Sequence, residues 1–359
     1  MTQIVFINMV IIISSTMKVA VYHNNKDVRI EQQPIPSISD DELLVKVMAS
    51  GICGSDVMEW YRIKKAPLIL GHEIAGIIEK TGKNVDTFKK GDKVFVTHHV
   101  PCNTCRYCLE GEHTICDTLH STRFYPGGFA EYLRVPPINV DRGTFLLPDT
   151  MSFDEGTFIE PLACVIRGFH KAGFKPAKTM LVLGSGIAGL LHIKLAKALG
   201  ATTIFATDLS DYRMKLAEKI GADYVFHAKE NIAEHIRKHN NGRLADFVVL
   251  TAGVPSAVHQ AFTCVEPGGT IMLFAPTTPG EKIPIDFFSV WNKQIHITST
   301  YAGAGRDIME AIDLIASKKI TVEDLISHRL PLKEAQKGFR LVAEADESMK
   351  VILEPHQKK

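Results

Sequence analysis

The chain has 359 residues, more than one ordinary hydrophobic core supports, so its length predicts two domains. Hydrophobic residues make up 45% and charged residues 23%, a composition typical of a soluble globular protein. The formal net charge is +1 and no dense basic block is present, which argues against nucleic acid or a membrane surface as a partner.

The start of the chain needs its own interpretation. Residues 4–13 form an apolar run that is too short to span a bilayer and lacks the basic leader and cleavage site of a secretory signal. The strand-like segment that follows begins at Met17. We therefore expect residues 1–16 to be an extension or a mis-assigned start; the alternative is an extension that packs as an extra strand. The cytoplasm is the expected location.

Residues 17–148 contain short strand-like runs separated by Gly, Pro and Asp turns, a pattern typical of a β-rich domain. The clearest runs are residues 43–47, 74–78 and 93–96.

Four of the seven cysteines lie close together inside this region, in a segment that we call the cysteine lobe (residues 102–116). The spacing Cys102-x2-Cys105-x2-Cys108-x7-Cys116 in a chain without a signal indicates a metal rather than disulfides. Four thiolates complete the tetrahedral coordination of zinc, so the predicted zinc is structural. An iron–sulfur cluster is the alternative, but its motif usually ends with Cys-Pro three residues on, whereas here Asp117 follows a more distant cysteine.

After residue 160 the pattern changes to strand, Gly-rich turn and helix, which predicts a doubly wound parallel sheet. We expect a helix over residues 187–199 and, later, a helix from Ile308 and a final strand over residues 349–353. The expected strands of the sheet are residues 180–183, 204–207, 247–250, 270–274 and 295–299.

A G-x-G-x-x-G motif follows the first of these strands and opens the helix, as in dinucleotide-binding sites. Its glycines permit a tight turn and a close approach of the pyrophosphate to the helix N-terminus. Asp208 ends the next strand, where a carboxylate binds the adenosine ribose and repels a 2′-phosphate, so NAD is favoured over NADP. The predicted cofactor-binding residues are Gly184, Ser185, Gly186, Ile187, Ala188, Gly189, Asp208 and Arg213.

Three further motifs supply candidate ligands for a second metal: Cys53 in Cys-Gly-Ser-Asp, His72 and Glu73 in Gly-His-Glu, and Glu160 in Glu-Pro-Leu-Ala. Each residue has a simpler explanation when it is taken alone: a core cysteine, a turn histidine and an acid at a helix N-terminus. Together they supply the three protein ligands that a catalytic zinc needs, with one open position.

The order of these motifs resembles the zinc-containing medium-chain dehydrogenases, and most closely the branch of the sorbitol (polyol) and threonine dehydrogenases. The resemblance extends from Met17 to the C-terminus. It implies an α/β protein with a GroES-like catalytic domain, residues 17–160 with a C-terminal return over 300–359, and a Rossmann domain over 161–299. It also implies that Cys53, His72, Glu73 and Glu160 form the catalytic zinc shell, with either glutamate binding through a water or exchanging with substrate.

The implied activity is a zinc-dependent, NAD-linked oxidation of a secondary alcohol of a polyol, sugar or sugar derivative to a ketone. Zinc acidifies the alcohol, and the nicotinamide accepts the hydride. Ser55 lies two residues after Cys53, where it can accept the alcohol proton; the alternative is a serine that caps its own turn. Threonine 3-dehydrogenase activity, a non-enzymatic relative that binds nucleotide and a zinc-free reductase are the other functions considered.

Two departures from the family pattern affect the prediction. Met58 replaces a histidine of the proton path, so we expect Glu160 or Glu73 to serve as the base, with Glu59 as the alternative. The arginine that polyol dehydrogenases use on substrate has no match near residues 298–301.

Four other residues near these motifs are interpreted as structural. His99 resembles a histidine of the threonine dehydrogenases, but His98 and His99 are interpreted as polar residues at a strand end. Cys164 and Cys264 are interpreted as small core residues.

Family members are usually dimers or tetramers. The strand over residues 295–299 follows the apolar side chains Phe287, Phe288 and Trp291. We expect it to be an edge strand that pairs two copies in a homodimer or homotetramer, because an exposed apolar edge otherwise promotes aggregation.

Overall fold

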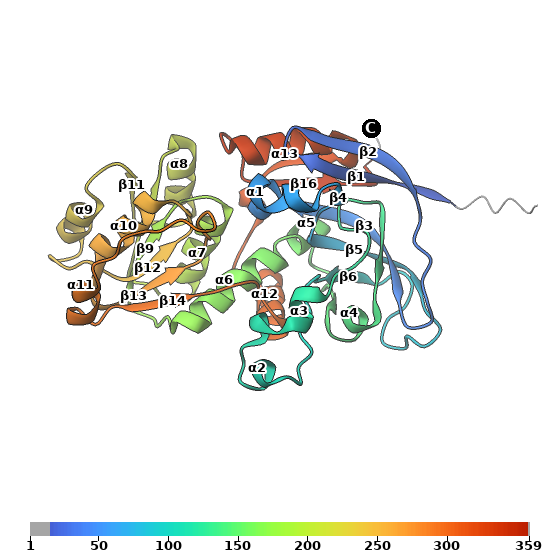
Figure 1. Ribbon diagram of the computed structural model, residues 1–359, viewed down its shortest axis with the longest axis horizontal. Helices are drawn as coiled ribbons and strands as arrows, with labels where there is room; N and C mark the ends of the chain where they lie inside the picture. Colours follow the sequence, from blue (N-terminus) through green and yellow to red (C-terminus); the bar gives the residue numbers. More distant parts are fainter. Residues whose placement is uncertain (1–14, 358–359) are drawn as a thin grey trace, which may run out of the picture.

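The computed structural model describes residues 15–357, and it divides into a part built mainly from the N-terminal half and a part built from a parallel sheet (Figure 1). The predicted extension lies largely outside the described residues. The fold opens with β1 (Thr16–Asn24), which confirms the strand expected around Met17. None of the helices within residues 15–357 is long and apolar enough to cross a membrane.

The N-terminal part contains two sheets, as the β-rich pattern predicted. In the smaller sheet β1 lies between its two neighbours, β2 (Asp27–Pro34) and β4 (Leu68–Ile69). The larger sheet has the order β15 (Ile326–Pro331), β16 (Lys350–Glu354), β3 (Leu43–Ile52), β5 (Glu73–Thr81), β6 (Lys93–Val96) and β8 (Thr144–Leu146), and β7 (Tyr132–Val135) also pairs with β3. The C-terminal strand β16 runs antiparallel to β3, so the end of the chain returns to the first part.

Short helices fill the connections of this part and form the cysteine lobe, which projects from the body (Figure 1). The lobe and the segment after it carry α2 (Arg106–Leu109), η3 (His113–Ile115) and α3 (Asp117–Ser121). The others are η1 (Gly54–Val57), α1 (Glu59–Arg62), η2 (Ile63–Lys65), α4 (Pro137–Arg142), α5 (Phe153–Gly156), η4 (Glu323–Leu325), η5 (Leu332–Glu334) and α13 (Ala335–Glu344).

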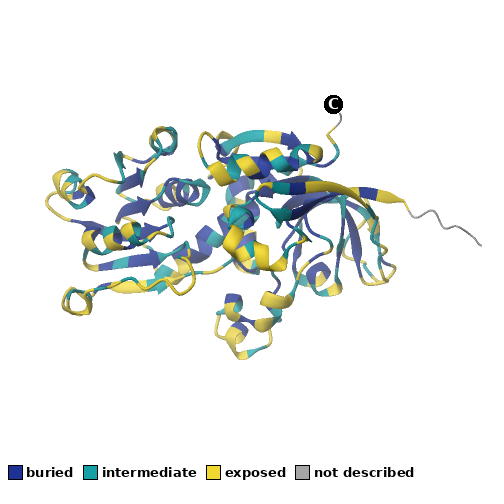
Figure 2. Ribbon diagram, turned by 45° about the horizontal axis from the view of Figure 1, so that its top comes forward, coloured by how far each residue is buried: buried dark blue, intermediate teal, exposed yellow. Residues whose placement is uncertain are grey.

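The second part is a six-stranded parallel sheet of Rossmann topology. Its order is β11 (Tyr224–His227), β10 (Thr203–Asp208), β9 (Thr179–Leu183), β12 (Ala245–Leu250), β13 (Val265–Leu273) and β14 (His296–Ser299). Counted from β9, this is the order 3-2-1-4-5-6 of a doubly wound dinucleotide-binding fold. Every residue of β9 is buried, because helices cover both faces of such a sheet (Figure 2). The covering helices are α7 (Ile187–Ala198), α8 (Asp211–Ile220), α9 (Ile232–His239) and α10 (Pro255–Cys264). The short helix α11 (Phe287–Asn292) precedes β14 and has no buried residue.

Two helices join the parts: α6 (Ile159–Ala172) and α12 (Gly305–Ala316). Buried side chains of α6 belong to one hydrophobic cluster that contains Phe95 of β6 and Met180 of β9, so the core is continuous through this helix. The predicted boundary at residue 160 therefore falls inside a helix rather than in a linker, and the exact limits of the two domains stay predictions.

Candidate active site and zinc centres

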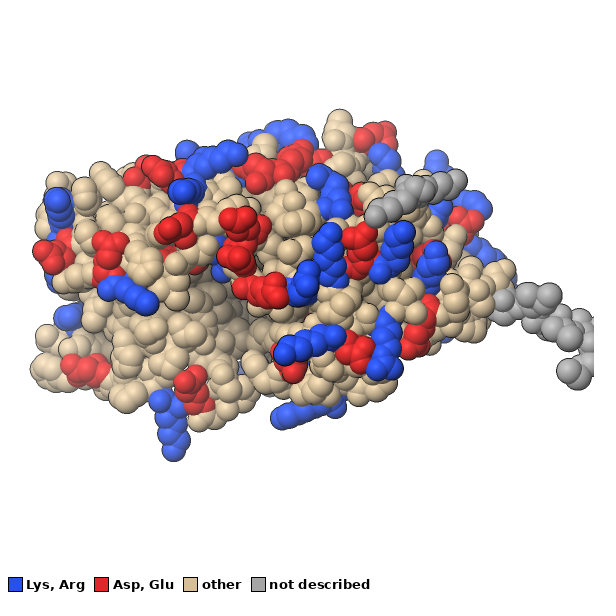
Figure 3. All heavy atoms as spheres, turned by 90° about the horizontal axis from the view of Figure 1, so that it is seen from above, with Lys and Arg blue, Asp and Glu red and all other residues tan. Residues whose placement is uncertain are grey.

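A cavity of about 2110 Å³ lies between the two parts, and the surface is hollowed there when the molecule is seen from above (Figure 3). Cys53, His72 and Glu160 line it from the first part. Ile187 and Thr251 line it from the second, at the carboxyl ends of β9 and β12, where parallel sheets bind their ligands.

Three predicted ligands of the catalytic metal meet at one end of this cavity. Cys53 follows β3, and His72 and Glu73 stand at the start of the neighbouring strand β5, so sheet pairing brings the two motifs together. Their ligand atoms all lie within 4.8 Å of one another. Gly51 faces Glu73 across the pair, and a side chain there would place its Cβ 2.3 Å from Glu73 Oε2. Only glycine leaves room for this carboxylate.

Asp56 orients the histidine. Its Oδ1 lies 3.4 Å from His72 Nδ1, which leaves the other ring nitrogen to bind a metal. Burial acts to lower the pKa of His72, but the charge of Asp56 and their hydrogen bond raise this pKa well above its usual range. Asp56 is fully buried and also accepts a hydrogen bond of 3.1 Å from the backbone N–H of Cys53. One carboxylate therefore positions two of the candidate ligands.

A lysine that the sequence did not reveal holds Glu73. Lys350 of β16 donates a hydrogen bond of 2.5 Å from Nζ to Glu73 Oε2, and both side chains are completely buried. The other carboxylate oxygen, Oε1, is buried without a hydrogen-bond partner among the described residues. An unpartnered anionic oxygen beside a thiol and an imidazole fits a zinc ion, which accepts such a ligand set.

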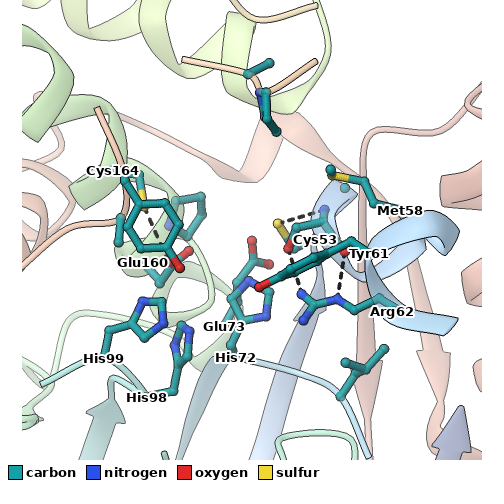
Figure 4. Close-up of a pocket in the computed structure, with 18 of the residues that line it drawn as sticks. Cys53, Met58, Tyr61, Arg62, His72, Glu73, His98, His99, Glu160 and Cys164 are labelled. Carbon is teal, nitrogen blue, oxygen red and sulfur yellow. Dashed lines mark hydrogen bonds between the residues drawn. The ribbon is translucent and has the colours of Figure 1, made fainter. Parts of the chain in front are cut away.

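Glu160 faces this cluster from the first turn of α6 (Figure 4) but does not belong to the group of atoms within 4.8 Å. Burial raises the pKa of Glu160, an effect that His72 opposes and Glu73 strengthens. Cys164, one turn further along α6, donates a hydrogen bond of 3.4 Å from Sγ to Glu160 Oε1. The prediction that Cys164 is a core residue is therefore wrong, because its thiol lines the cavity. Cys264 is a core residue as predicted.

Ser55 lies beside Cys53 and is held by a second residue that the sequence did not reveal, Arg62 of α1. The guanidinium donates to the Ser55 carbonyl from Nε (2.9 Å) and to Ser55 Oγ from Nη2 (3.1 Å) (Figure 4). Met58 lines the cavity nearby. Glu59 is exposed and accepts a hydrogen bond of 3.1 Å from the backbone of Asn25, which directs it away from this role.

His98 and His99 lie just beyond the end of β6, after Thr97, as expected of residues near a strand end, but both line the cavity, and the His98 ring lies beside His72. Burial lowers the pKa of His99 to about 3, so the imidazole is neutral at physiological pH. The Nδ1 atoms of both rings are buried without a partner among the described residues, and Tyr301 packs 5.8 Å from the His99 ring. These groups give the cavity neutral hydrogen-bonding atoms.

The cysteine lobe has the geometry of a closed thiolate site. The Sγ atoms of Cys102 and Cys116 lie 3.6 Å apart, those of Cys105 and Cys108 lie 3.6 Å apart, and those of Cys102 and Cys108 lie 4.0 Å apart. Four sulfurs placed tetrahedrally around zinc, each about 2.3 Å from it, are about 3.8 Å from one another. Hydrogen bonds from Thr104 lower the pKa of the Cys102 thiol to about 5, which favours the ligating thiolate.

A buried arginine fastens the lobe to the body. Arg167, in the middle of α6, donates from Nε to Thr114 Oγ1 at 3.1 Å and from Nη2 to the Gly111 carbonyl at 3.5 Å. Its guanidinium also pairs with Glu112 of the lobe at 3.5 Å and with Asp307 of α12 at 3.7 Å. The lobe is thus attached to the same helix that presents Glu160.

The predicted dinucleotide turn has the expected shape. Gly184 adopts φ +99°, a backbone conformation that residues with a side chain rarely adopt. A Cβ added to Gly189 would lie 2.0 Å from the Gly184 carbonyl oxygen, so the helix and the turn pack too closely for any other residue there. Asp208 stands at the carboxyl end of β10, where Oδ2 accepts a hydrogen bond of 2.7 Å from the Ser185 N–H. The carboxylate therefore lies beside the turn, as the sequence predicted.

Gly186 leaves open space above the turn: the nearest atom that an added Cβ would meet is Arg213 Nη1, at 3.9 Å. Arg213 Nε is buried without a partner among the described residues. An open glycine beside an arginine whose Nε lacks a partner fits the pyrophosphate of a dinucleotide.

Comparisons with known proteins agree with this geometry. Residues 39–142 match the family model of the alcohol dehydrogenase GroES-like domain, and residues 188–317 match that of the zinc-binding dehydrogenases. The chain is 34% identical to the sorbitol dehydrogenase of Bacillus subtilis over 356 residues, which cover 96% of this chain and 99% of that protein.

Two solved structures have the same fold over nearly the whole chain. Galactitol-1-phosphate dehydrogenase from Escherichia coli superimposes with a TM-score of 0.84 at 31% identity and covers 94% of this chain and all of that one. A zinc-binding dehydrogenase from Sinorhizobium meliloti bound to NADP also gives 0.84, at 29% identity, and covers 95% of this chain and all of that one.

A zinc-ligand cluster that faces a dinucleotide turn across a cleft defines a zinc-dependent dehydrogenase. The chain belongs to the zinc-containing medium-chain alcohol dehydrogenase family, in its polyol dehydrogenase branch. The predicted family, the α/β fold class and the enzyme class are confirmed, as are zinc and a nicotinamide dinucleotide as the cofactor types.

Proposed function

We propose that the protein oxidises a secondary alcohol of a polyol, sugar or sugar derivative to the ketone, with NAD as the hydride acceptor. The observation that carries the proposal is the cluster of Cys53, His72 and Glu73, with Glu160 facing it, in a cavity shared with the Gly-rich turn. When bound there, zinc supplies a Lewis acid that lowers the pKa of the substrate hydroxyl. The bound nicotinamide supplies the hydride acceptor.

The side chains around that position have separable roles in this proposal. Cys53 and His72 bind the metal, with one or both glutamates completing the shell, directly or through water. Ser55 acts as a proton relay: Oγ accepts the substrate hydroxyl proton and releases its own hydroxyl proton to the base, so the serine stays neutral. Ser55 lies two residues after Cys53 and lines the cavity. Glu160 is the base that receives the proton from the site, because its carboxylate lines the cavity and faces the cluster of Cys53, His72 and Glu73.

The test is an activity screen of the purified, zinc-loaded protein with NAD across polyols, sugars, sugar acids and L-threonine. Polyol or sugar-derivative oxidation supports the proposal. Oxidation of L-threonine alone would replace it with the threonine 3-dehydrogenase activity. Metal analysis should find about two zinc ions per chain, one for each ligand set; iron with a visible charge-transfer band would contradict the zinc assignment.

The preference for NAD rests on Asp208 and is tested there. Asp208→Ala should weaken NAD binding and relax discrimination against NADP, because the carboxylate no longer repels the extra phosphate. A native enzyme that already prefers NADP under matched conditions would contradict this assignment.

We also propose a homodimer or homotetramer in the cytoplasm. The strand β14 is an edge strand, and the nearby Phe287, Phe288 and Trp291 are 75%, 68% and 74% exposed, a surface that pairing of two sheets would cover. The lobe needs reduced thiolates, which the cytoplasm maintains. A monomer by light scattering at micromolar concentration would contradict the assembly.

A further inference from the structure

The charged side chains that line the cavity fall into two groups, and those at the catalytic end are balanced. Glu73 is paired with the buried Lys350. Arg62 is paired with the buried Asp56. Glu160 faces the candidate zinc ligands, so a bound metal ion offsets its charge (Figure 4). A ligand at this end of the cavity therefore meets charges that already have partners.

The second group is not balanced. Lys64 and Lys65 of η2 and Arg123, two residues after α3, line the same cavity and are exposed to solvent. We call these three residues the cation rim. None of them has an ion pair within residues 15–357. The remaining acidic residue of the lining is Glu31 of β2, so three cations stand against one carboxylate.

Two contacts relate the rim to the catalytic end. Lys65 Nζ lies 5.3 Å from the centroid of the Tyr61 ring, which also lines the cavity, and this cation–π contact restricts the position of the ammonium. Arg123 directly precedes Phe124, whose ring packs 6.5 Å from that of His98. Burial lowers the pKa of His98 most, and the charge of Arg123 lowers this pKa further, so the guanidinium acts on a group beside the metal ligands.

This distribution of charge favours a ligand with a negative group at its outer end. A cleft lined by excess charge of one sign attracts ligands of the opposite sign, and its low-dielectric walls strengthen the attraction. The cofactor does not account for the rim, because its expected phosphate site is the Gly-rich turn of the second part, beside Arg213. The lining residues between 187 and 302 are all uncharged. The rim belongs to the first part, which presents the reacting end of the substrate.

We propose that the substrate is an anionic polyol or sugar derivative: the cation rim binds its phosphate or carboxylate group while a hydroxyl further along the molecule reaches the catalytic cluster. This inference rests on the proposed alcohol oxidation and narrows its substrate class. The two lysines act as point charges, and the planar guanidinium of Arg123 can bind two oxygens of the anion at once. An uncharged polyol leaves all three cations without a partner.

The experiment compares D-sorbitol 6-phosphate with D-sorbitol through the ratio of their kcat/KM values. The wild-type protein should favour the phosphate, and added salt should reduce the preference, because exposed charges are screened. The triple variant Lys64→Gln/Lys65→Gln/Arg123→Gln should lower the ratio by about 100-fold. This is about fivefold for each cation, the factor that corresponds to about 1 kcal/mol. D-gluconate, which carries a carboxylate, distinguishes the two anions; a preference for either one over D-sorbitol supports the proposal.

A matched control removes the same number of charges elsewhere. Lys175→Gln/Lys238→Gln/Lys319→Gln changes three exposed lysines that do not line the cavity, and it should leave the ratio unchanged. A fall in the ratio as large as that of the rim variant would assign the preference to overall charge and overturn the proposal.

The ratio also separates substrate binding from other roles of the rim. If the three cations served the cofactor, the rim variant would raise KM for NAD and lower kcat/KM for both alcohols equally. An unchanged ratio would therefore overturn the proposal. The melting temperature and the zinc content of each variant monitor its fold.

A second measurement needs no turnover. D-sorbitol 6-phosphate, D-gluconate and D-sorbitol are titrated into the complex of each protein with NADH, which cannot react with an alcohol, and binding is followed by NADH fluorescence. At least one anion should bind the wild type more tightly than D-sorbitol does, and the rim variant should lose the difference. If the wild type oxidises none of the three, the proposed function fails, while this titration still decides the role of the rim; equal binding of all three would refute it.

Discussion

The two candidate zinc-ligand sets of this protein are built in opposite ways. The cysteine lobe takes all four ligands from 15 consecutive residues, 102–116, and no strand is needed to bring the sulfur atoms together. The catalytic cluster draws on the end of β3, the start of β5 and the first turn of α6, and it keeps one side open to the cavity. The first set is a local unit, whereas the second exists only after the sheet and α6 have assembled.

This difference predicts different failures. Loss of a lobe ligand should remove structure, while loss of a residue at the catalytic cluster should change chemistry or local stability. Four experiments test the distinction, in order of decreasing effect.

The largest effect is expected for Cys105→Ser or Cys108→Ser. Three thiolates cannot close the tetrahedral site, and structural zinc contributes about 10–16 kcal/mol to the folding of small zinc domains. We expect poor folding or lost assembly and about one zinc ion per chain, measured by solubility, light scattering and metal analysis. A folded, assembled variant with altered substrate preference instead would contradict the structural role.

Lys350→Met should come next, because it leaves the Glu73 carboxylate buried without its cation. Breaking a buried pair by removing one partner costs about 3–5 kcal/mol, read from urea unfolding. Lys350→Arg is the matched control and should recover most of the loss. A Lys350→Met protein as stable as the wild type would contradict this role, because it would show that the negative charge of Glu73 is compensated without Lys350.

The proton path is tested by Glu160→Ala and Ser55→Ala. Each should lower turnover by about a hundredfold or more, the size of a lost acid–base step, with zinc retained. Met58→His should change the rate little, because the proposed path does not pass through residue 58. If Glu160→Ala turned over normally with its zinc intact, Glu160 would not be the base and the proposed proton path would be wrong.

The smallest effect is expected for Cys164→Val, which removes the thiol that donates to Glu160 and keeps a similar volume. A lost hydrogen bond to a carboxylate corresponds to about 1.5–3 kcal/mol at most, and reorientation of Glu160 should recover part of it. We expect a several-fold lower kcat with an unchanged KM for NAD. Cys264→Val, in the core of the sheet domain, is the matched control and should leave kcat unchanged.

The sequence predicted those features whose residues lie close together in the chain. The lobe, the Gly-rich turn and Asp208 are recognisable from spacing because the chemistry fixes short distances between ligands. The motifs of Cys53 and His72 were recognisable for the same reason, since each forms part of a local turn.

Residues that act across the fold were not predictable in this way. Lys350 is 277 positions from Glu73, and a lysine at the start of an apolar strand is typical of an exposed end. Only the pairing of β16 with β3 brings it to the site. Arg62 sits in a short helix without a motif of its own. Cys164 could have been found, because positions i and i+4 of a helix face the same way and Glu160 is four residues earlier.

The attachment of the lobe through Arg167 gives the two metal centres a shared support. Arg167 lies seven residues after Glu160, about 10 Å along the axis of α6. Its guanidinium binds the lobe, while the first turn of the same helix faces the catalytic cluster. The lobe, whose four thiolates are proposed to hold a structural zinc, is therefore attached through Arg167 to the same helix that presents the Glu160 carboxylate to the cluster of Cys53, His72 and Glu73.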